Sequence, residues 1–141
     1  MRFLIVDDAD APLKVLQRML VALGHEVAGT AHNGAQAVEA FNRLRPDVLI
    51  MDVIMPRMNG LAALRAIRAA HPEARVVMAS SLQSCQTALE AERLGALYCL
   101  AKPYDECKVR KVVDAIARAC HKAPPEQSGS APRFRPAHST A

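Results

Sequence analysis

Short apolar runs alternate with amphipathic stretches five times along the chain, and this alternation restricts the fold more than any other feature of the sequence. The apolar runs cover residues 2–6, 25–31, 47–51, 74–80 and 97–101. Near-continuous apolar runs of this length are typical of strands buried on both faces of a parallel sheet. We therefore predict an α/β fold with one five-stranded parallel sheet, doubly wound and covered by helices on both faces.

Each apolar run is followed by a stretch of helical periodicity, over residues 11–24, 33–45, 60–71, 84–94 and 105–122. In the first of these, Asp10 is the candidate N-cap and Gly24 marks the end of the helix. The last residues are rich in Pro, Ser, Gly and Ala and have no periodic apolar positions. We expect one domain over residues 1–121 and a disordered tail over residues 122–141.

The composition excludes several classes of protein. No apolar stretch approaches the roughly 20 residues that a membrane span requires, and the N-terminal run becomes acidic too early for a signal peptide. The formal net charge is +4, with about half of the excess in the tail, so no clustered basic face for nucleic acid is expected. The four cysteines lack zinc-type spacing and are expected to be reduced apolar fillers of a cytoplasmic protein.

Chemically distinctive residues stand where the predicted strands end. Asp7 and Asp8 follow the first strand and Asp52 follows the third, while Ser80 ends the fourth and Lys102 follows the fifth. Because parallel strands all point the same way, these residues are expected to meet along one edge of the sheet, where such folds bind ligands. Taken singly, the aspartates could cap a helix, Ser80 could be a turn hydroxyl and Lys102 a surface lysine.

Taken together, these residues indicate a site for a metal ion and a phosphoryl group. Clustered carboxylates repel one another unless a cation joins them, and an all-oxygen cluster with room for water suits Mg²⁺. Lys102 adds a fixed positive charge and Ser80 can donate a hydrogen bond. Asp52, at the end of the central strand, is the predicted nucleophile.

The stretches "HEVAGTAHNGAQAVEAF" and "DVIMPRMNGLAALRAI" are most similar to the stand-alone chemotaxis type of response regulator. Three segments resemble the receiver domains of two-component response regulators in general. They are "LIVDD", "DVLIMDVIMPRMNG" and "LAKP", and the resemblance covers about residues 1–121. It implies a flavodoxin-like sheet with strand order 2-1-3-4-5. It also implies that Asp52 accepts a phosphoryl group from a histidine kinase or phosphotransfer protein, with no other enzymatic activity than this self-phosphorylation and its reversal by hydrolysis.

The same resemblance implies roles for the remaining site residues. Asp7, Asp8 and Asp52 would bind Mg²⁺ together with the backbone carbonyl of Ile54. Ser80 would turn toward the phosphoryl oxygens, and Lys102 would pair with them after a cis peptide bond to Pro103. The output would be altered binding to a partner protein, such as a motor component, a phosphotransfer protein or a kinase, by a chain that is monomeric when unphosphorylated.

Three positions depart from the family pattern. Where the family commonly has Tyr or Phe, three residues before the lysine, this chain has Cys99, and strand alternation should point the neighbouring Tyr98 to the opposite face. Ile54 and Leu82 stand at positions that flank the path of the attacking water in this family. Two apolar side chains should exclude water and lengthen the lifetime of the aspartyl phosphate, unless both merely pack against their loops.

Other functions stay open at this point. An aspartate-nucleophile phosphatase would use similar residues, but its signature is a DxD motif after the first strand, where this chain has adjacent Asp7 and Asp8 followed by Asp10. A pseudo-receiver would bind partners without taking phosphate, although it should lack an aspartate or the lysine. The chain could also be the receiver part of a longer regulator that has lost its output domain.

Overall fold

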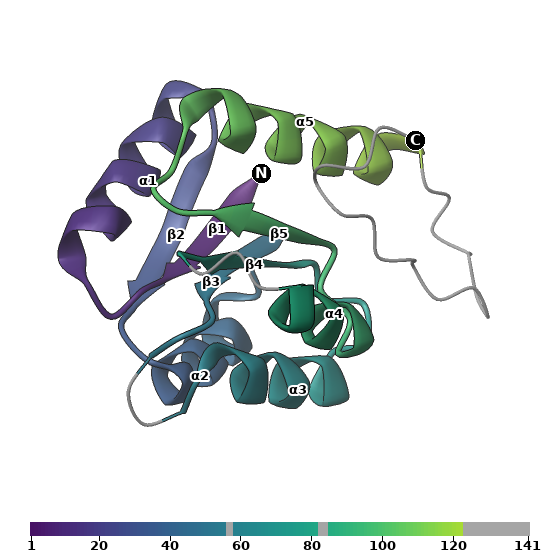
Figure 1. The fold of residues 1–141 in the computed structure, drawn as a ribbon. Coiled ribbons are helices and arrows are strands. Elements are labelled where there is room, and N and C mark those ends of the chain that lie inside the picture. The colour runs from purple at the N-terminus through teal and green to yellow at the C-terminus, as the bar shows by residue number, and fades with distance from the viewer. Residues whose placement is uncertain (56–57, 82–84, 123–141) are drawn as a thin grey trace.

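A computed structural model describes residues 1–55, 58–81 and 85–122, and in this part strands and helices alternate along the chain (Figure 1). The strands are β1 (Arg2–Val6), β2 (Glu26–Ala31), β3 (Val48–Asp52), β4 (Val76–Ser80) and β5 (Tyr98–Ala101). The helices are α1 (Asp10–Ala22), α2 (Gly34–Leu44), α3 (Gly60–Ala70), α4 (Cys85–Arg93) and α5 (Glu106–Lys122). The predicted ranges differ from these by at most two residues at either end.

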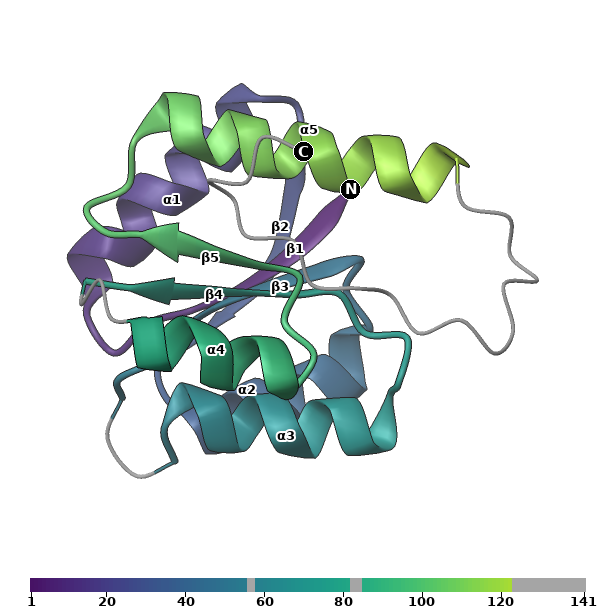
Figure 2. The same cartoon turned by 45° about the vertical axis from the view of Figure 1, so that its right-hand side comes forward.

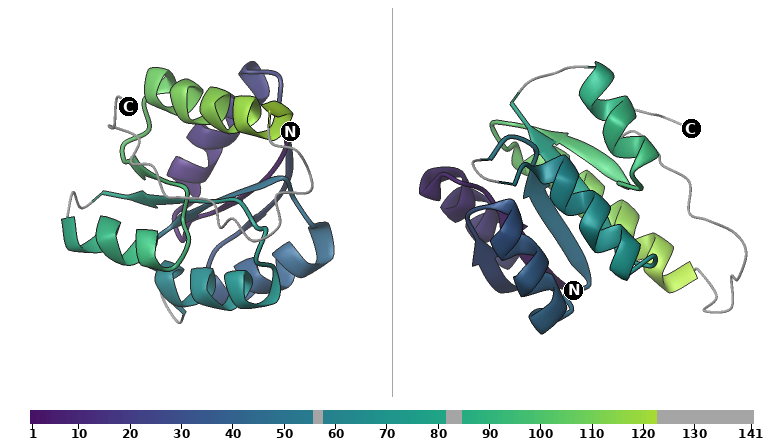
Figure 3. Two further views of the ribbon diagram at one scale, coloured as in Figure 1. Left: turned by 90° about the vertical axis from the view of Figure 1, so that its right-hand side faces the viewer. Right: turned by 90° about the horizontal axis from the view of Figure 1, so that it is seen from below.

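The five strands form one parallel sheet in the order β2-β1-β3-β4-β5, as predicted. Helices α1 and α5 cover one face of the sheet, and α2, α3 and α4 cover the other (Figure 2). Seen from below, α2, α3 and α4 lie side by side beneath the sheet (Figure 3, right). The expected doubly wound, flavodoxin-like architecture is therefore confirmed.

Side chains of the central strands alternate between two apolar cores. Leu4, Leu49 and Met78 pack on the side of α2, α3 and α4, whereas their neighbours Phe3, Ile50 and Val77 pack on the side of α1 and α5. Every residue of β3 is buried. This two-sided burial explains why the strands appear in the sequence as near-continuous apolar runs.

Helix α1 begins differently from the prediction. Asp10 is its first helical residue, and the N-cap is Ala9, whose side chain makes no capping hydrogen bond. The Ala9 N–H itself donates to Oδ1 of Asp7 at 3.0 Å, so the N-cap residue is tied to the residue that follows β1. The start of α1 is thereby fixed to the edge of the sheet that carries the acidic residues.

Other expectations have mixed outcomes. The predicted tail falls outside the described residues except for Lys122, which ends α5. Cys107 is exposed, so the expectation that all cysteines fill the core is wrong for this residue. None of the described helices combines the length and the apolar character that crossing a membrane would require.

Candidate functional site

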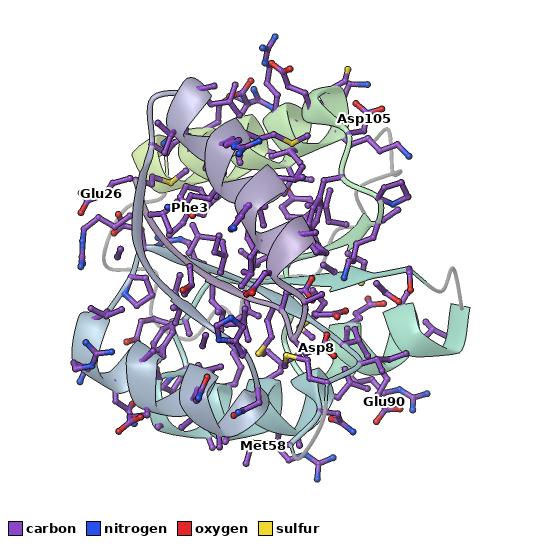
Figure 4. All side chains as sticks on the ribbon, turned by 90° about the vertical axis from the view of Figure 1, so that its left-hand side faces the viewer. Phe3, Asp8, Glu26, Met58, Glu90 and Asp105 are labelled. Atoms are coloured by element: carbon purple, nitrogen blue, oxygen red, sulfur yellow. The ribbon has the colours of Figure 1, made fainter. Side chains whose placement is uncertain are left out.

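The structure brings the predicted strand-end residues to one edge of the sheet. Asp7 directly follows β1, Asp52 ends β3, Ser80 ends β4, and Lys102 follows β5. Figure 4 looks onto this edge, with Asp8 near the start of α1. The convergence follows from the parallel topology, because every strand of the sheet delivers its last residue to the same edge.

Three carboxylates form the centre of the site. Asp7, Asp8 and Asp52 each offer one oxygen, and these three oxygens lie within 4.8 Å of one another. Asp7 and Asp52 are only 1% and 6% exposed, whereas Asp8 is open to solvent. Among the residues that the structure describes, no other group of acidic, His or Cys side chains forms such a cluster.

Lys102 joins the two buried carboxylates. Its Nζ donates to Oδ2 of Asp7 at 2.7 Å and to Oδ2 of Asp52 at 3.3 Å. Burial alone would lower the pKa of Lys102, but the hydrogen bond to Asp7 and the charge of Asp52 outweigh it and raise this pKa above its ordinary value. The lysine therefore carries its positive charge at the centre of the cluster.

The carboxyl group of Asp52 is held in a balance of opposing effects. Burial raises the pKa of Asp52, the charge of Lys102 opposes this, and the nearby Asp7 raises it further, so that the net shift is upward. A backbone hydrogen bond from Ile54 favours the ionised form. Burial therefore outweighs the neighbouring Lys102 in its effect on this pKa.

Tyr104 lies close to this cluster in the structure, although nothing in the sequence predicts it as a site residue. Burial raises the pKa of its phenol, and the charges of Asp7 and Asp52 raise it further. The ring packs against the apolar core on the side of α1 and α5. The only signal in the sequence is its position two residues after Lys102, which does not by itself indicate proximity to Asp7.

Ser80 and Lys102 are neighbours through the backbone. The Lys102 N–H donates to the carbonyl of Ser80 at 3.0 Å, and Ser80 pairs with Ala101 in the sheet. Ser80 is half-buried at the end of β4. The peptide bond between Lys102 and Pro103 is cis, in agreement with the expectation from the family resemblance.

The positions that depart from the family pattern are Cys99 on β5, Ile54 after β3, and Leu82 after β4. Cys99 packs against the core beneath α3 and α4, and Tyr98 packs against the opposite core, as strand alternation predicts. Burial raises the pKa of the Cys99 thiol, and the charge of Glu92 adds to this, so the thiol stays protonated. Ile54 is 56% exposed and does not bury itself against its loop, whereas Leu82 lies outside the described residues.

Comparison with known proteins shows that this chain is similar to response regulator receiver domains. Residues 3–114 match the sequence profile described as the response regulator receiver domain. The chemotaxis protein CheY of Thermotoga maritima is 35% identical over 117 residues, which are 83% of this chain and 98% of that protein. A protein-glutamate methylesterase/protein-glutamine glutaminase of Geobacter metallireducens is 46% identical over 105 residues, covering 72% of this chain but 30% of that protein.

A solved structure of a chemotaxis protein has a similar fold. It is the CheX-CheY-BeF3-Mg²⁺ complex of Borrelia burgdorferi, which matches with a TM-score of 0.81 and 30% sequence identity. The match covers 83% of this chain and 89% of the chain in that complex.

Proposed function

Because the chain belongs to the response regulator receiver family, we propose that it takes a phosphoryl group onto Asp52 in the presence of Mg²⁺ and signals through altered binding to a partner protein. The observation that carries this proposal is the cluster of Asp7, Asp8 and Asp52, whose oxygens lie within 4.8 Å of one another beside the ammonium group of Lys102. A receiver domain is not a conventional enzyme. Its chemistry is confined to its own aspartate.

The donor set fits a Mg²⁺ site. All three side chains offer oxygen, which Mg²⁺ prefers, and the exposed Asp8 leaves one side of the cluster open for the waters that this ion retains. Asp7, Asp8 and Asp52 would hold the ion together with the backbone carbonyl of Ile54. When bound, the ion supplies positive charge that offsets the repulsion between the carboxylates and the incoming phosphoryl group.

The protein residues would act on the transfer as follows. An oxygen of Asp52 forms a bond to phosphorus as the bond between phosphorus and the histidine nitrogen of the donor breaks, and the donor imidazole leaves with the bonding electron pair. Lys102, which reaches Asp52 Oδ2 at 3.3 Å, would then pair with a phosphoryl oxygen. Ser80, at the end of β4, would donate a hydrogen bond to another.

The signal would follow from a shift between two arrangements of the loops that carry Ser80 and Lys102. A phosphoryl group adds charge and strong acceptor oxygens, and it favours whichever arrangement binds those oxygens better. The surface expected to respond comprises α4, β5 and the connection between β4 and α4. With Cys99 in place of an aromatic residue, the movement of Ser80 has no ring at this position to accompany it.

The partners follow from the family and from the similar proteins. The proposed donor is a histidine kinase or a phosphotransfer protein. The similarity to CheY proteins favours chemotaxis, with a motor component, a phosphotransfer protein or a kinase as the receiver of the signal. We also propose that the chain is cytoplasmic, is monomeric when unphosphorylated, and binds neither nucleic acid directly nor membrane.

A second candidate is that the chain is the receiver part of a longer regulator. The observation that favours it is the match to the methylesterase of Geobacter metallireducens, of which the similar region covers only 30%. A pseudo-receiver is disfavoured by the presence of all three aspartates and of the lysine. A DxD-type phosphatase is disfavoured because Asp10 lies on α1, outside the carboxylate cluster.

The proposed function is tested by incubating the protein with acetyl phosphate and Mg²⁺ and recording the intact mass. We expect one added phosphoryl group in the parent chain and none in Asp52→Ala or in the parent with EDTA. Steady release of inorganic phosphate from many small phosphomonoesters would instead indicate a phosphatase. No addition to a parent chain that binds Mg²⁺ would indicate a pseudo-receiver.

A further inference from the structure

The first residue of α2, Gly34, lies directly against Met58 in the connection between β3 and α3. The Gly34 N–H donates to the Met58 carbonyl at 3.1 Å. A Cβ at position 34 would lie 2.4 Å from that carbonyl oxygen and 2.8 Å from Cβ and Cγ of Met58. Cβ atoms in proteins essentially never come closer than 3.0 Å to a non-bonded heavy atom. Gly34 does not have a positive φ, so the requirement for glycine here comes from space and not from backbone conformation.

On one side, Gly34 is connected to the segment that carries Asp7. The Asp7 N–H donates to the carbonyl of Ala31 at 3.1 Å, and Ala31 ends β2 just before α2 begins. Asn33 caps α2 by accepting the Gln36 N–H at 2.8 Å. The start of α2 is therefore held at a fixed place relative to the backbone of Asp7.

On the other side, Met58 is connected to the segment that carries Asp52. Gly60 donates its N–H to the carbonyl of Val53 at 2.7 Å, which closes the connection back onto the residue after Asp52. A Cβ at Gly60 would lie 2.1 Å from the carbonyl oxygen of Asp52, so this return is equally close. The Met58 side chain packs against the core beneath α2 and α3. Figure 4, which looks onto the edge of the sheet that carries Asp8, also labels Met58.

The two sides meet only because position 34 has no side chain. We propose that Gly34 is a positioning residue for the acidic site: it lets Met58 lie against the start of α2 and, through the return of Gly60 to Val53, sets the placement of Asp52 and Ile54 relative to Asp7 and Asp8. This inference rests on the proposed function, since it assumes that these residues bind Mg²⁺. Groups that hydrogen-bond to metal ligands change metal affinity by about ten- to hundredfold when they are altered. Gly34 acts through Met58 and not on a ligand directly, so the lower end of this range is expected.

The test compares Gly34→Ala with Gly29→Ala, a control that adds the same methyl group at another close glycine contact. A Cβ at Gly29 would lie 2.6 Å from Cδ1 of Leu44, within the β2–α2 packing and away from Met58. Both variants add a methyl group at a close contact, but at Gly29 the neighbour is the end of the flexible Leu44 side chain, whereas at Gly34 it is the backbone carbonyl of Met58. Only Gly34→Ala therefore pushes Met58 away from α2. Mg²⁺ affinity is measured by titrating MgCl2 into ¹⁵N-labelled protein and following amide chemical shifts, after urea unfolding has confirmed that each variant is folded.

We expect Gly34→Ala to bind Mg²⁺ about tenfold more weakly or worse, and Gly29→Ala to bind it about as tightly as the parent. Equal affinities of the two variants would overturn the inference and leave the proposed function intact. No Mg²⁺ binding by the parent would overturn both.

If Gly34→Ala does not fold, Met58→Ala and Met19→Ala decide the matter by the same comparison. Both methionines are partly buried, but Met19 packs against the core on the side of α1 and α5. Weaker Mg²⁺ binding by Met58→Ala alone supports the inference, and equal binding by the two overturns it.

Discussion

Replacing Lys102 by methionine should destabilise the protein strongly when Mg²⁺ is absent. The ammonium group lies 2.7 Å and 3.3 Å from carboxylates that are only 1% and 6% exposed, so its loss leaves two buried negative charges unpaired. Removing one partner of a buried pair costs about 3–5 kcal/mol. The Lys102 side chain is 14% exposed, and Asp8 is open to solvent beside the cluster. Because water can partly solvate the two carboxylates, we expect a loss at the lower end of this range, about 3 kcal/mol.

The assay is urea unfolding followed by circular dichroism in EDTA, with Lys108→Met as the control. Lys108 is exposed on α5, and its substitution should change the free energy of unfolding by no more than about 0.5 kcal/mol. Two further results should follow from the charge argument. Saturating Mg²⁺ should restore part of the loss in Lys102→Met, and adding Asp52→Asn to it should restore stability instead of lowering it further. The reasoning is refuted if Lys102→Met loses no more stability than Lys108→Met.

Three further predictions concern the rim of the site and the scaffold. Ile54→Asn should shorten the half-life of the aspartyl phosphate severalfold, because the exposed Ile54 side chain is replaced by one that can orient water; an unchanged decay of the phosphorylated mass would sink this idea. Asn59→Ala should lower the free energy of unfolding by about 1 kcal/mol in urea titrations, because the Ala62 N–H loses its acceptor at 2.8 Å, and no change would contradict this capping role. Burial, with the Met1 amino group 3.0 Å away, lowers the pKa of His25, so stability present above about pH 6.5 should be lost as the pH falls. Unfolding at several pH values should therefore show a smaller loss in His25→Gln than in the parent, and equal losses would contradict it.

The fold was predictable from the sequence because the central strands β1, β3 and β4 are buried on both faces. Residues such as Leu49 and Ile50 alternate between the two apolar cores, so nearly every position of these strands is apolar and each appears as an uninterrupted run. The order of the strands came from the resemblance to a known family and not from periodicity. The N-cap of α1 does not follow from residue type, because Ala9 takes this position without a side-chain cap and is held by a hydrogen bond to Asp7.

The site was predictable to the extent that topology determines it. Parallel strands deliver Asp7, Asp52 and Lys102 to one edge whatever the details of packing. The proximity of Tyr104 to the acidic cluster and the close approach of Gly34 to Met58 depend on how loops pack in three dimensions, for which the sequence offers no period or spacing. Such contacts become visible only when the distances are known.

In the proposed function, Asp52 itself carries the phosphoryl group in a reaction that depends on Mg²⁺. The most direct measurement is to react the protein with acetyl phosphate, reduce the product with borohydride, and locate the modified residue by peptide mass spectrometry. Borohydride converts an aspartyl phosphate to homoserine and leaves free aspartate unchanged. We expect homoserine at position 52 in Mg²⁺ and none in EDTA. Homoserine at position 7 or 8, or modification that is independent of the metal, would show that Asp52 is not a metal-dependent phosphoacceptor.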